Sequence, residues 1–129
     1  MQKLRVLLAE DEEPLRDVLR RVLEAKGMEV VGVVTNGAEA VQLSLTVESD
    51  VLLIDLKMPV MDGIEAARQI TSRVTFPIII MHSAYADPSF MEEARAAGVD
   101  EWLEKGMRPR ELCARIYEIA GRTGSGAPG

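Results

Sequence analysis

Five short apolar runs recur along the chain at intervals that suit the strands of one sheet. They cover residues 4–9, 29–34, 51–54, 77–81 and 101–103; Val, Ile and Leu dominate the first four, and the fifth is the short run Glu-Trp-Leu. Most of these runs lack the strict alternation of polar and apolar residues that marks a strand with one exposed face. They therefore predict parallel strands that are covered on both faces.

The segments between these runs carry helical periodicity. The first contains Leu15, Val18, Leu19, Val22 and Leu23, whose spacings of three and four residues place them on one helical face. Capping residues, a proline in a first turn and glycines after a last turn frame several of these segments. The expected helices span about 14–27, 36–45, 62–73, 87–98 and 112–120.

The alternation of strand and helix, repeated five times, indicates an α/β fold. Right-handed crossovers between parallel strands place helices on both faces of a doubly wound, flavodoxin-like sheet. We expect the strand order 2-1-3-4-5 in a five-stranded parallel sheet and one domain over residues 1–121. Residues 122–129 are rich in Gly, and we predict that they form a flexible tail or the stub of a linker.

Composition narrows the classes of function. The 129 residues carry a formal net charge of −6 with a pI of about 4.8, which argues against broad nucleic-acid binding and against anionic membranes. The single cysteine, Cys113, allows no disulfide within the chain, and no apolar run approaches the length of a membrane span. We therefore expect a cytoplasmic domain that binds neither a membrane nor nucleic acid directly.

Polar residues follow the strands where the chain leaves the sheet. Glu10 and Asp11 follow the first strand, Asp55 the third, Ser83 the fourth and Lys105 the fifth. In doubly wound sheets, ligand sites lie beyond the carboxyl ends of the strands. Three crowded carboxylates repel one another, and a hard divalent cation such as Mg²⁺ relieves that repulsion. With metal, hydroxyl and ammonium close by, Asp55 is predicted to act as a nucleophile toward phosphorus.

Other interpretations of these residues have to be weighed. An acidic pair before a helix is more often a cap than a metal site, so only the joint placement after four strands favours a site. A magnesium phosphatase would need a second acid, and Lys57 stands two residues after Asp55. Nucleotide binding would need a glycine-rich first turn, where the chain has four acids at 10–13. His82 is interpreted as a structural histidine rather than a phosphoryl relay.

Five motifs at these positions resemble one family. They are Glu10-Asp11, the Asp-x-x-Met-Pro-x-Met-Asp-Gly run from Asp55 to Gly63, Ser83-Ala84, Ala97-Gly98 and Leu103-Glu-Lys105. Over about residues 3–121 the chain resembles the receiver domain of two-component response regulators. Segments 55–59 and 105–112 are most similar to receivers joined to helix-turn-helix or antiterminator outputs, although Gly106 stands where many members have proline.

The resemblance implies a phosphorylation-dependent signalling switch rather than an enzyme with a substrate of its own. Asp55 would accept a phosphoryl group from a sensor histidine kinase or phosphotransfer protein, with Mg²⁺ as the cofactor. Asp11 would bind the metal directly, Glu10 through water and Lys57 through its backbone carbonyl, beside Asp55 itself.

Further positions would bind the phosphoryl group and pass the signal on. Ser83 and Lys105 would hold the phosphoryl oxygens, and Trp102 occupies the position of the switch aromatic. Pro59 would shape the neighbouring loop, and Tyr85 is expected to shield the phosphate and slow self-dephosphorylation. The fourth and fifth helices with the fifth strand are the expected surface for an output domain, a partner protein or a phosphorylation-dependent homodimer.

Overall fold

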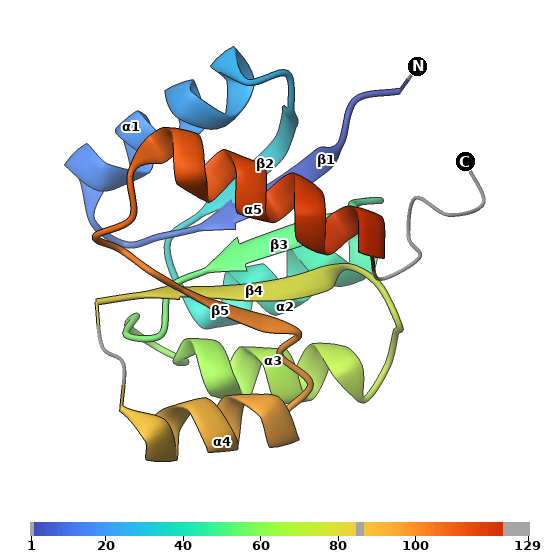
Figure 1. Cartoon of the computed structure of the whole chain (residues 1–129). Helices are drawn as coiled ribbons and strands as arrows, with labels where there is room; N and C mark the ends of the chain where they lie inside the picture. The colour runs from blue at the N-terminus through green and yellow to red at the C-terminus, as the bar shows by residue number, and fades with distance from the viewer. Residues whose placement is uncertain (1, 85–86, 123–129) are drawn as a thin grey trace.

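A computed structural model describes residues 2–84 and 87–122 and shows strands and helices in strict alternation (Figure 1). The strands are β1 Arg5–Ala9, β2 Glu29–Val34, β3 Val51–Ile54, β4 Ile78–Ser83 and β5 Glu101–Glu104. The helices are α1 Glu13–Ala25, α2 Gly37–Thr46, α3 Gly63–Thr71, α4 Pro88–Ala96 and α5 Pro109–Arg122. Every predicted element is confirmed, and the largest difference among the strands is the longer β4.

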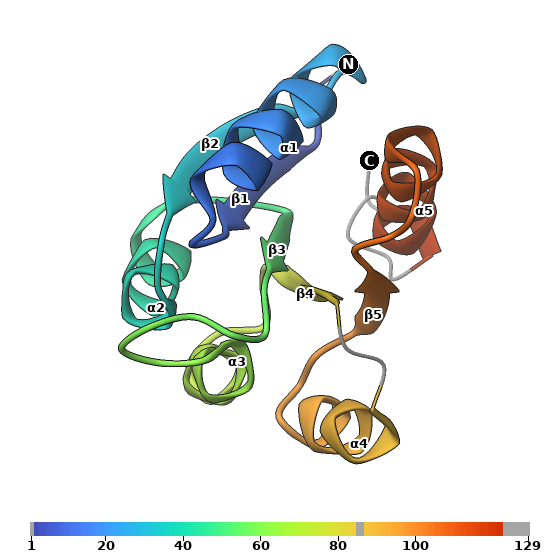
Figure 2. The same ribbon diagram turned by 90° about the vertical axis from the view of Figure 1, so that its left-hand side faces the viewer.

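The strands form one parallel sheet in the order β2-β1-β3-β4-β5. Helices α1 and α5 cover one face of this sheet, and α2, α3 and α4 cover the other, as the two perpendicular views show (Figures 1 and 2). The predicted doubly wound, flavodoxin-like fold and its strand order are therefore confirmed.

Two apolar cores lie on the two faces of the sheet. Side chains alternate along β3, so Leu52 and Ile54 enter the core beneath α2, α3 and α4, whereas Val51 and Leu53 enter the core beneath α1 and α5. Because both faces are covered, each of these positions has to be apolar. This is the physical reason for the uninterrupted apolar runs in the sequence.

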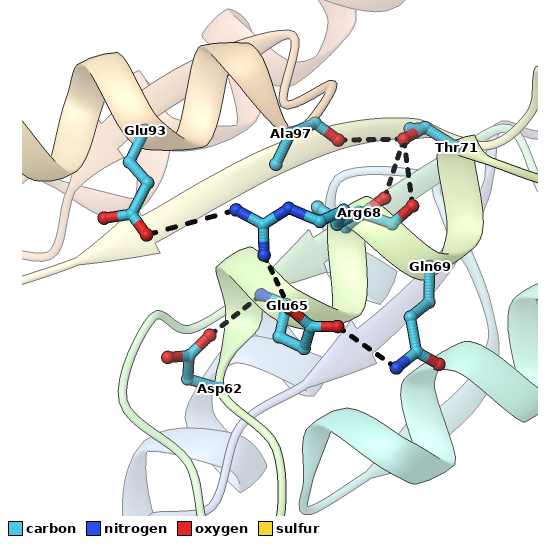
Figure 3. A network of polar contacts seen from close by, with 8 residues as sticks. Asp62, Glu65, Arg68, Gln69, Thr71, Glu93 and Ala97 are labelled. Carbon is cyan, nitrogen blue, oxygen red and sulfur yellow. Dashed lines mark hydrogen bonds and ion pairs between the residues drawn. The ribbon is translucent and has the colours of Figure 1, made fainter.

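Helices α3 and α4 are joined by polar contacts at their carboxyl-terminal ends (Figure 3). The hydroxyl of Thr71 donates to the carbonyl of Ala97 at 2.8 Å, and the Arg68 guanidinium lies 4.0 Å from the Glu93 carboxylate. Gly98 follows with a φ of +101°, and a Cβ there would lie 2.5 Å from Thr71 Cγ2. Only glycine fits this close approach without strain.

Helix α5 runs one residue beyond the predicted domain boundary and ends at Arg122. Residues 123–129 lie outside the described part of the chain, so the predicted flexible tail or linker stub stays a prediction. Cys113 is free and buried in α5. Within residues 2–84 and 87–122, no helix has the length and apolar character that crossing a membrane requires.

Candidate functional site

Backbone hydrogen bonds place the predicted site residues at one edge of the sheet. The amide of Asp55 donates to the carbonyl of Ala9 at 3.0 Å, and the amide of Glu10 donates across to β2 at 3.0 Å. The amide of Lys105 donates to the carbonyl of Ser83 at 2.9 Å. These bonds continue the parallel ladders past the strand ends, so the side chains of the predicted site start from a well-ordered backbone.

The start of α3 approaches the backbone of Asp55 closely. A Cβ at Gly63 would lie 2.3 Å from the carbonyl oxygen of Asp55, and the Gly63 amide donates to the carbonyl of Leu56 at 2.8 Å. Asp62 caps the helix by accepting from the amide of Glu65 at 2.8 Å (Figure 3). The Asp-Gly pair therefore begins α3 and seats it against the strand end that carries Asp55.

Glu10, Asp11 and Asp55 form an acidic pocket. Each offers a carboxylate oxygen, and the three oxygens lie within 4.8 Å of one another. Glu10 and Asp55 are 1% and 6% exposed, whereas Asp11 is open to solvent. Hard oxygen donors with one side open to water suit a divalent cation that keeps part of its hydration shell. The pocket is therefore a cluster that could hold a metal ion.

Lys105 connects the two buried acids. Its ammonium nitrogen lies 3.0 Å from Asp55 Oδ2 and 3.2 Å from Glu10 Oε1. Burial alone would lower the pKa of Lys105, but the hydrogen bond to Asp55 and the charges of Asp55 and Glu10 outweigh it, and the pKa is raised. The ammonium is therefore held in its charged form at the centre of the pocket.

One ammonium does not compensate the negative charge of the pocket. Burial raises the pKa of Glu10, and the nearby charge of Asp55 raises it further. The amide of Glu12 donates to Glu10 Oε2 at 3.2 Å, and Lys105 also favours the ionised form, but neither reverses the shift. The part of this shift that comes from the charge of Asp55 agrees with the repulsion that the sequence predicted.

The family model for the response regulator receiver domain matches residues 6–117. The chain belongs to this family. It is 41% identical over 112 residues to the transcriptional regulatory protein PdtaR of Mycobacterium tuberculosis, and the matched segment makes up 87% of this chain and 54% of that protein. It is 37% identical over 114 residues to the transcriptional regulatory protein LiaR of Bacillus subtilis, with coverage of 88% and 54%. The signal receiver domain of the putative response regulator NarL from Mycobacterium tuberculosis superimposes with a TM-score of 0.88 at 28% identity, covering 94% of this chain and 98% of that chain.

The receiver spans about half the length of PdtaR and LiaR. Their descriptions as transcriptional regulators agree with the predicted likeness to receivers joined to nucleic-acid-binding outputs. The predicted family and its class of function, a receiver module of two-component signalling, are confirmed. Receivers of this family act together with histidine kinases and output domains.

Two neighbouring residues at the end of β4 face opposite layers of the receiver. Ser83 is fully buried at the last position of the strand, next to Lys105. His82 is 3% exposed and pairs in register with Leu103 of the core beneath α1 and α5. Burial lowers the pKa of His82 to about 4, and its Nδ1 has no hydrogen-bond partner among the described residues. An enclosed, neutral imidazole supports the structural interpretation of His82.

The other predicted residues lie around the pocket at different depths. Trp102 is half-buried on β5 and packs against the core beneath α2, α3 and α4. Lys57 and Pro59 are exposed in the loop between β3 and α3, and the Lys57 ammonium lies 5.7 Å from the ring centroid of Phe90. Tyr85 lies outside the described residues, so its shielding role stays a prediction, as does the metal-binding role of the Lys57 carbonyl.

Two contacts of the receiver site were not predicted from the sequence. Arg16 of α1 donates from one guanidinium nitrogen to the carbonyls of Glu10 at 3.1 Å and Asp11 at 3.2 Å. The second is the contact between the ring of Phe90, on α4, and the ammonium of Lys57. A basic residue next to the apolar stripe of α1, one turn after the acids, is the signal that could have indicated the first contact.

Proposed function

We propose that this receiver takes a phosphoryl group from a sensor histidine kinase or phosphotransfer protein onto Asp55. The observation that carries the proposal is the Lys105 ammonium, 3.0 Å from Asp55 Oδ2 at the end of a buried strand. An ammonium at this distance stabilises charge that develops on oxygens beside the carboxylate. This distance supports a role for Lys105 in binding the oxygens of an incoming phosphoryl group.

In the transfer step, an Asp55 carboxylate oxygen attacks phosphorus and an oxygen–phosphorus bond forms. The bond from phosphorus to the imidazole nitrogen of the donor breaks, and its electron pair stays on that nitrogen. The donor leaves as neutral imidazole when its other nitrogen carries a proton. Lys105 and the hydroxyl of Ser83 hold the transferred oxygens.

The acidic pocket is the proposed site of Mg²⁺. Asp11 and Asp55 would bind it directly, Glu10 through water and Lys57 through its backbone carbonyl. The oxygen-only donor set, with carboxylates within 4.8 Å of one another, supports this assignment. When bound, the ion supplies positive charge that neutralises the phosphoryl oxygens.

Mass spectrometry after incubation with acetyl phosphate and Mg²⁺ tests the transfer. Wild type is expected to gain one alkali-labile phosphoryl group on Asp55, and Asp55→Asn is expected to gain none. Asp17→Asn, which removes an exposed carboxylate of α1, is the matched control and should be labelled like wild type. A label on His82, or no label on wild type, contradicts the proposal.

Ser83 and Trp102 form the proposed switch. Trp102 pairs in register with Met81, so the indole shares a layer with α4. A small hollow between α4 and β5 lies beside it, with Met91 and Ala94 in its lining. Movement of Ser83 toward the phosphoryl group opens room in this layer, and the indole turns inward. The surface of α4, β5 and α5 then changes for an output domain, a partner protein or a second copy of the chain.

Tryptophan emission tests the switch, since the chain has one tryptophan. Addition of Mg²⁺ and beryllofluoride, which mimics a bound phosphoryl group, is expected to shift or quench the emission. The change should disappear in Asp55→Asn and become smaller in Ser83→Ala. Unchanged emission in a fully phosphorylated protein would mean that Trp102 is a fixed packing residue.

The receiver promotes only its own phosphorylation and dephosphorylation in this proposal, and it works in the cytoplasm. The residue two positions after Asp55 supports the absence of an activity toward other substrates, because a phosphatase needs a second acid there and this chain has Lys57, whose ammonium lies beside Phe90. Sustained, Asp55-dependent hydrolysis of p-nitrophenyl phosphate would instead identify a phosphatase.

A further inference from the structure

Arg16 closes the loop between β1 and α1 from the helix side. One guanidinium nitrogen donates to the carbonyl of Glu10 at 3.1 Å and to the carbonyl of Asp11 at 3.2 Å. The backbone amide of Arg16 donates to the carbonyl of Glu12 at 2.9 Å. The side chain of this half-buried residue therefore bonds two consecutive peptide units of the acidic loop, and its backbone makes the usual helical hydrogen bond to a third.

This loop needs a restraint from elsewhere. Its N-cap residue, Glu12, makes no side-chain capping hydrogen bond, although such a bond commonly fixes the start of a helix. The carboxylates of Glu10 and Asp11 approach that of Asp55, and like charges at this distance push apart. The bonds from Lys105 and from the amide of Glu12 end on the carboxylate of Glu10. The carbonyls of Glu10 and Asp11 therefore need a restraint of their own if the loop is to stay in place against this repulsion.

Bonds to two successive carbonyls fix the orientation of the peptide units that carry them. They thereby fix the direction in which the Cα–Cβ bonds of Glu10 and Asp11 leave the backbone. Lysine cannot replace this contact fully, because its ammonium is a compact donor on a flexible chain, whereas guanidinium presents donors in a rigid plane.

We infer that Arg16 is a positioning residue of the metal site, which aligns the carboxylates of Glu10 and Asp11 with that of Asp55 before the ion binds. Arg16 acts through the backbone and contacts neither the ion nor the phosphoryl group. The inference rests on the proposed Mg²⁺ site. Groups that orient metal ligands commonly contribute strongly to metal affinity.

Calorimetric titration with Mg²⁺ measures this contribution directly. Arg16→Met is expected to raise the Kd for Mg²⁺ roughly tenfold, the lower range for loss of a ligand-orienting group. Arg16→Lys is expected to lie between wild type and Arg16→Met. Arg20→Met is the matched control, because Arg20 lies on the same helix but pairs with Glu24 at 3.5 Å, and its Kd should equal that of wild type.

The outcomes separate this inference from the proposed metal site. Absence of Mg²⁺ binding by wild type overturns the site itself. Binding by wild type with an equal Kd in Arg16→Met overturns the positioning role alone, including when urea denaturation shows that the variant is less stable. If Arg16→Met does not fold, an Arg16→Lys variant with the wild-type Kd overturns the inference instead.

Discussion

Acid should destabilise this receiver through His82, and replacing that residue with leucine isolates the effect. His82 is 3% exposed on β4, on the same face as Ile78 and Ile80 and opposite Leu103. Burial disfavours the charged imidazolium, the positive charge of Lys105 adds to this, and the pKa falls from 6.5 to about 4. The folded protein therefore holds His82 neutral at a pH where the unfolded chain would already protonate it.

The size of the effect follows from the pKa difference. Between 6.5 and about 4 the unfolded chain binds a proton that the folded receiver does not, so the free energy of unfolding falls as the pH falls. At about 1.4 kcal/mol per pKa unit, the contribution lost across this window is roughly 3 kcal/mol. Above pH ~6.5 the imidazole of His82 is neutral in both the folded and the unfolded protein, so it no longer changes the free energy of unfolding.

Urea denaturation followed by circular dichroism, repeated from about pH 7 to about pH 4, measures this contribution. The free energy of unfolding of wild type is expected to fall more steeply than that of His82→Leu, by roughly 3 kcal/mol over the window. The carboxylates titrate in both proteins, so their contributions to the free energy of unfolding cancel in the comparison. Met81→Leu, at the neighbouring buried position on the other face, should follow wild type. Parallel pH profiles for wild type and His82→Leu would refute the reasoning.

Three substitutions test other strained or repulsive features by the same denaturation assay. Without Mg²⁺, Asp55→Asn is expected to raise the free energy of unfolding by on the order of 1 kcal/mol, since one of the repelling charges leaves the pocket; a clear loss of stability would contradict the acidic repulsion. Gly98→Ala is expected to cost roughly 2 kcal/mol, because φ is +101° and the new Cβ would meet Thr71. Its control, Gly121→Ala in α5, has open space around the new Cβ and should gain up to about 1 kcal/mol; equal effects would exclude the clash. Val60→Asn should gain about 1 kcal/mol, because a β-branched residue holds a φ of 70°; no gain would mean that the loop is unstrained.

Much of the fold could be predicted because its signals are local. The four residues of β3 are buried on both faces, and only an apolar run satisfies that requirement. Parallel strands then bring their carboxyl ends to one edge, so Glu10 and Asp55 could be placed together from chain order alone. The same reasoning predicted the end of β4 too early, at residue 81, because His82 and Ser83 are polar although both are buried.

Contacts between distant side chains could not be predicted in the same way. Lys105 bonds Asp55 and Glu10, which lie 50 and 95 residues away, and the choice of oxygen depends on the packed geometry. The contacts of Arg16 are closer in sequence, but they are made to backbone carbonyls, so the basic residue itself is the only sequence signal and the residue types of its partners add none. The positive φ of Val60 carries no sequence signal either, since valine is a residue that rarely adopts it.

Helix α4 is held unequally at its two ends, and this predicts which part of it would move on the proposed phosphorylation of Asp55. Its carboxyl-terminal end is bound to α3 through Thr71 and Ala97 (Figure 3), whereas Phe90 in its first turn contacts the exposed Lys57 of the loop between β3 and α3. An exposed cation–π contact is worth about 0.5–1 kcal/mol, small enough for a phosphoryl group that attracts Lys57 to outweigh it. Hydrogen exchange with beryllofluoride and Mg²⁺ is therefore expected to change in the first turn of α4 and to stay constant in its last turn. Lys57→Met should alter exchange in the first turn without phosphorylation. A uniform change along α4 would show that the helix shifts as a rigid unit and that its contact with α3 is no anchor.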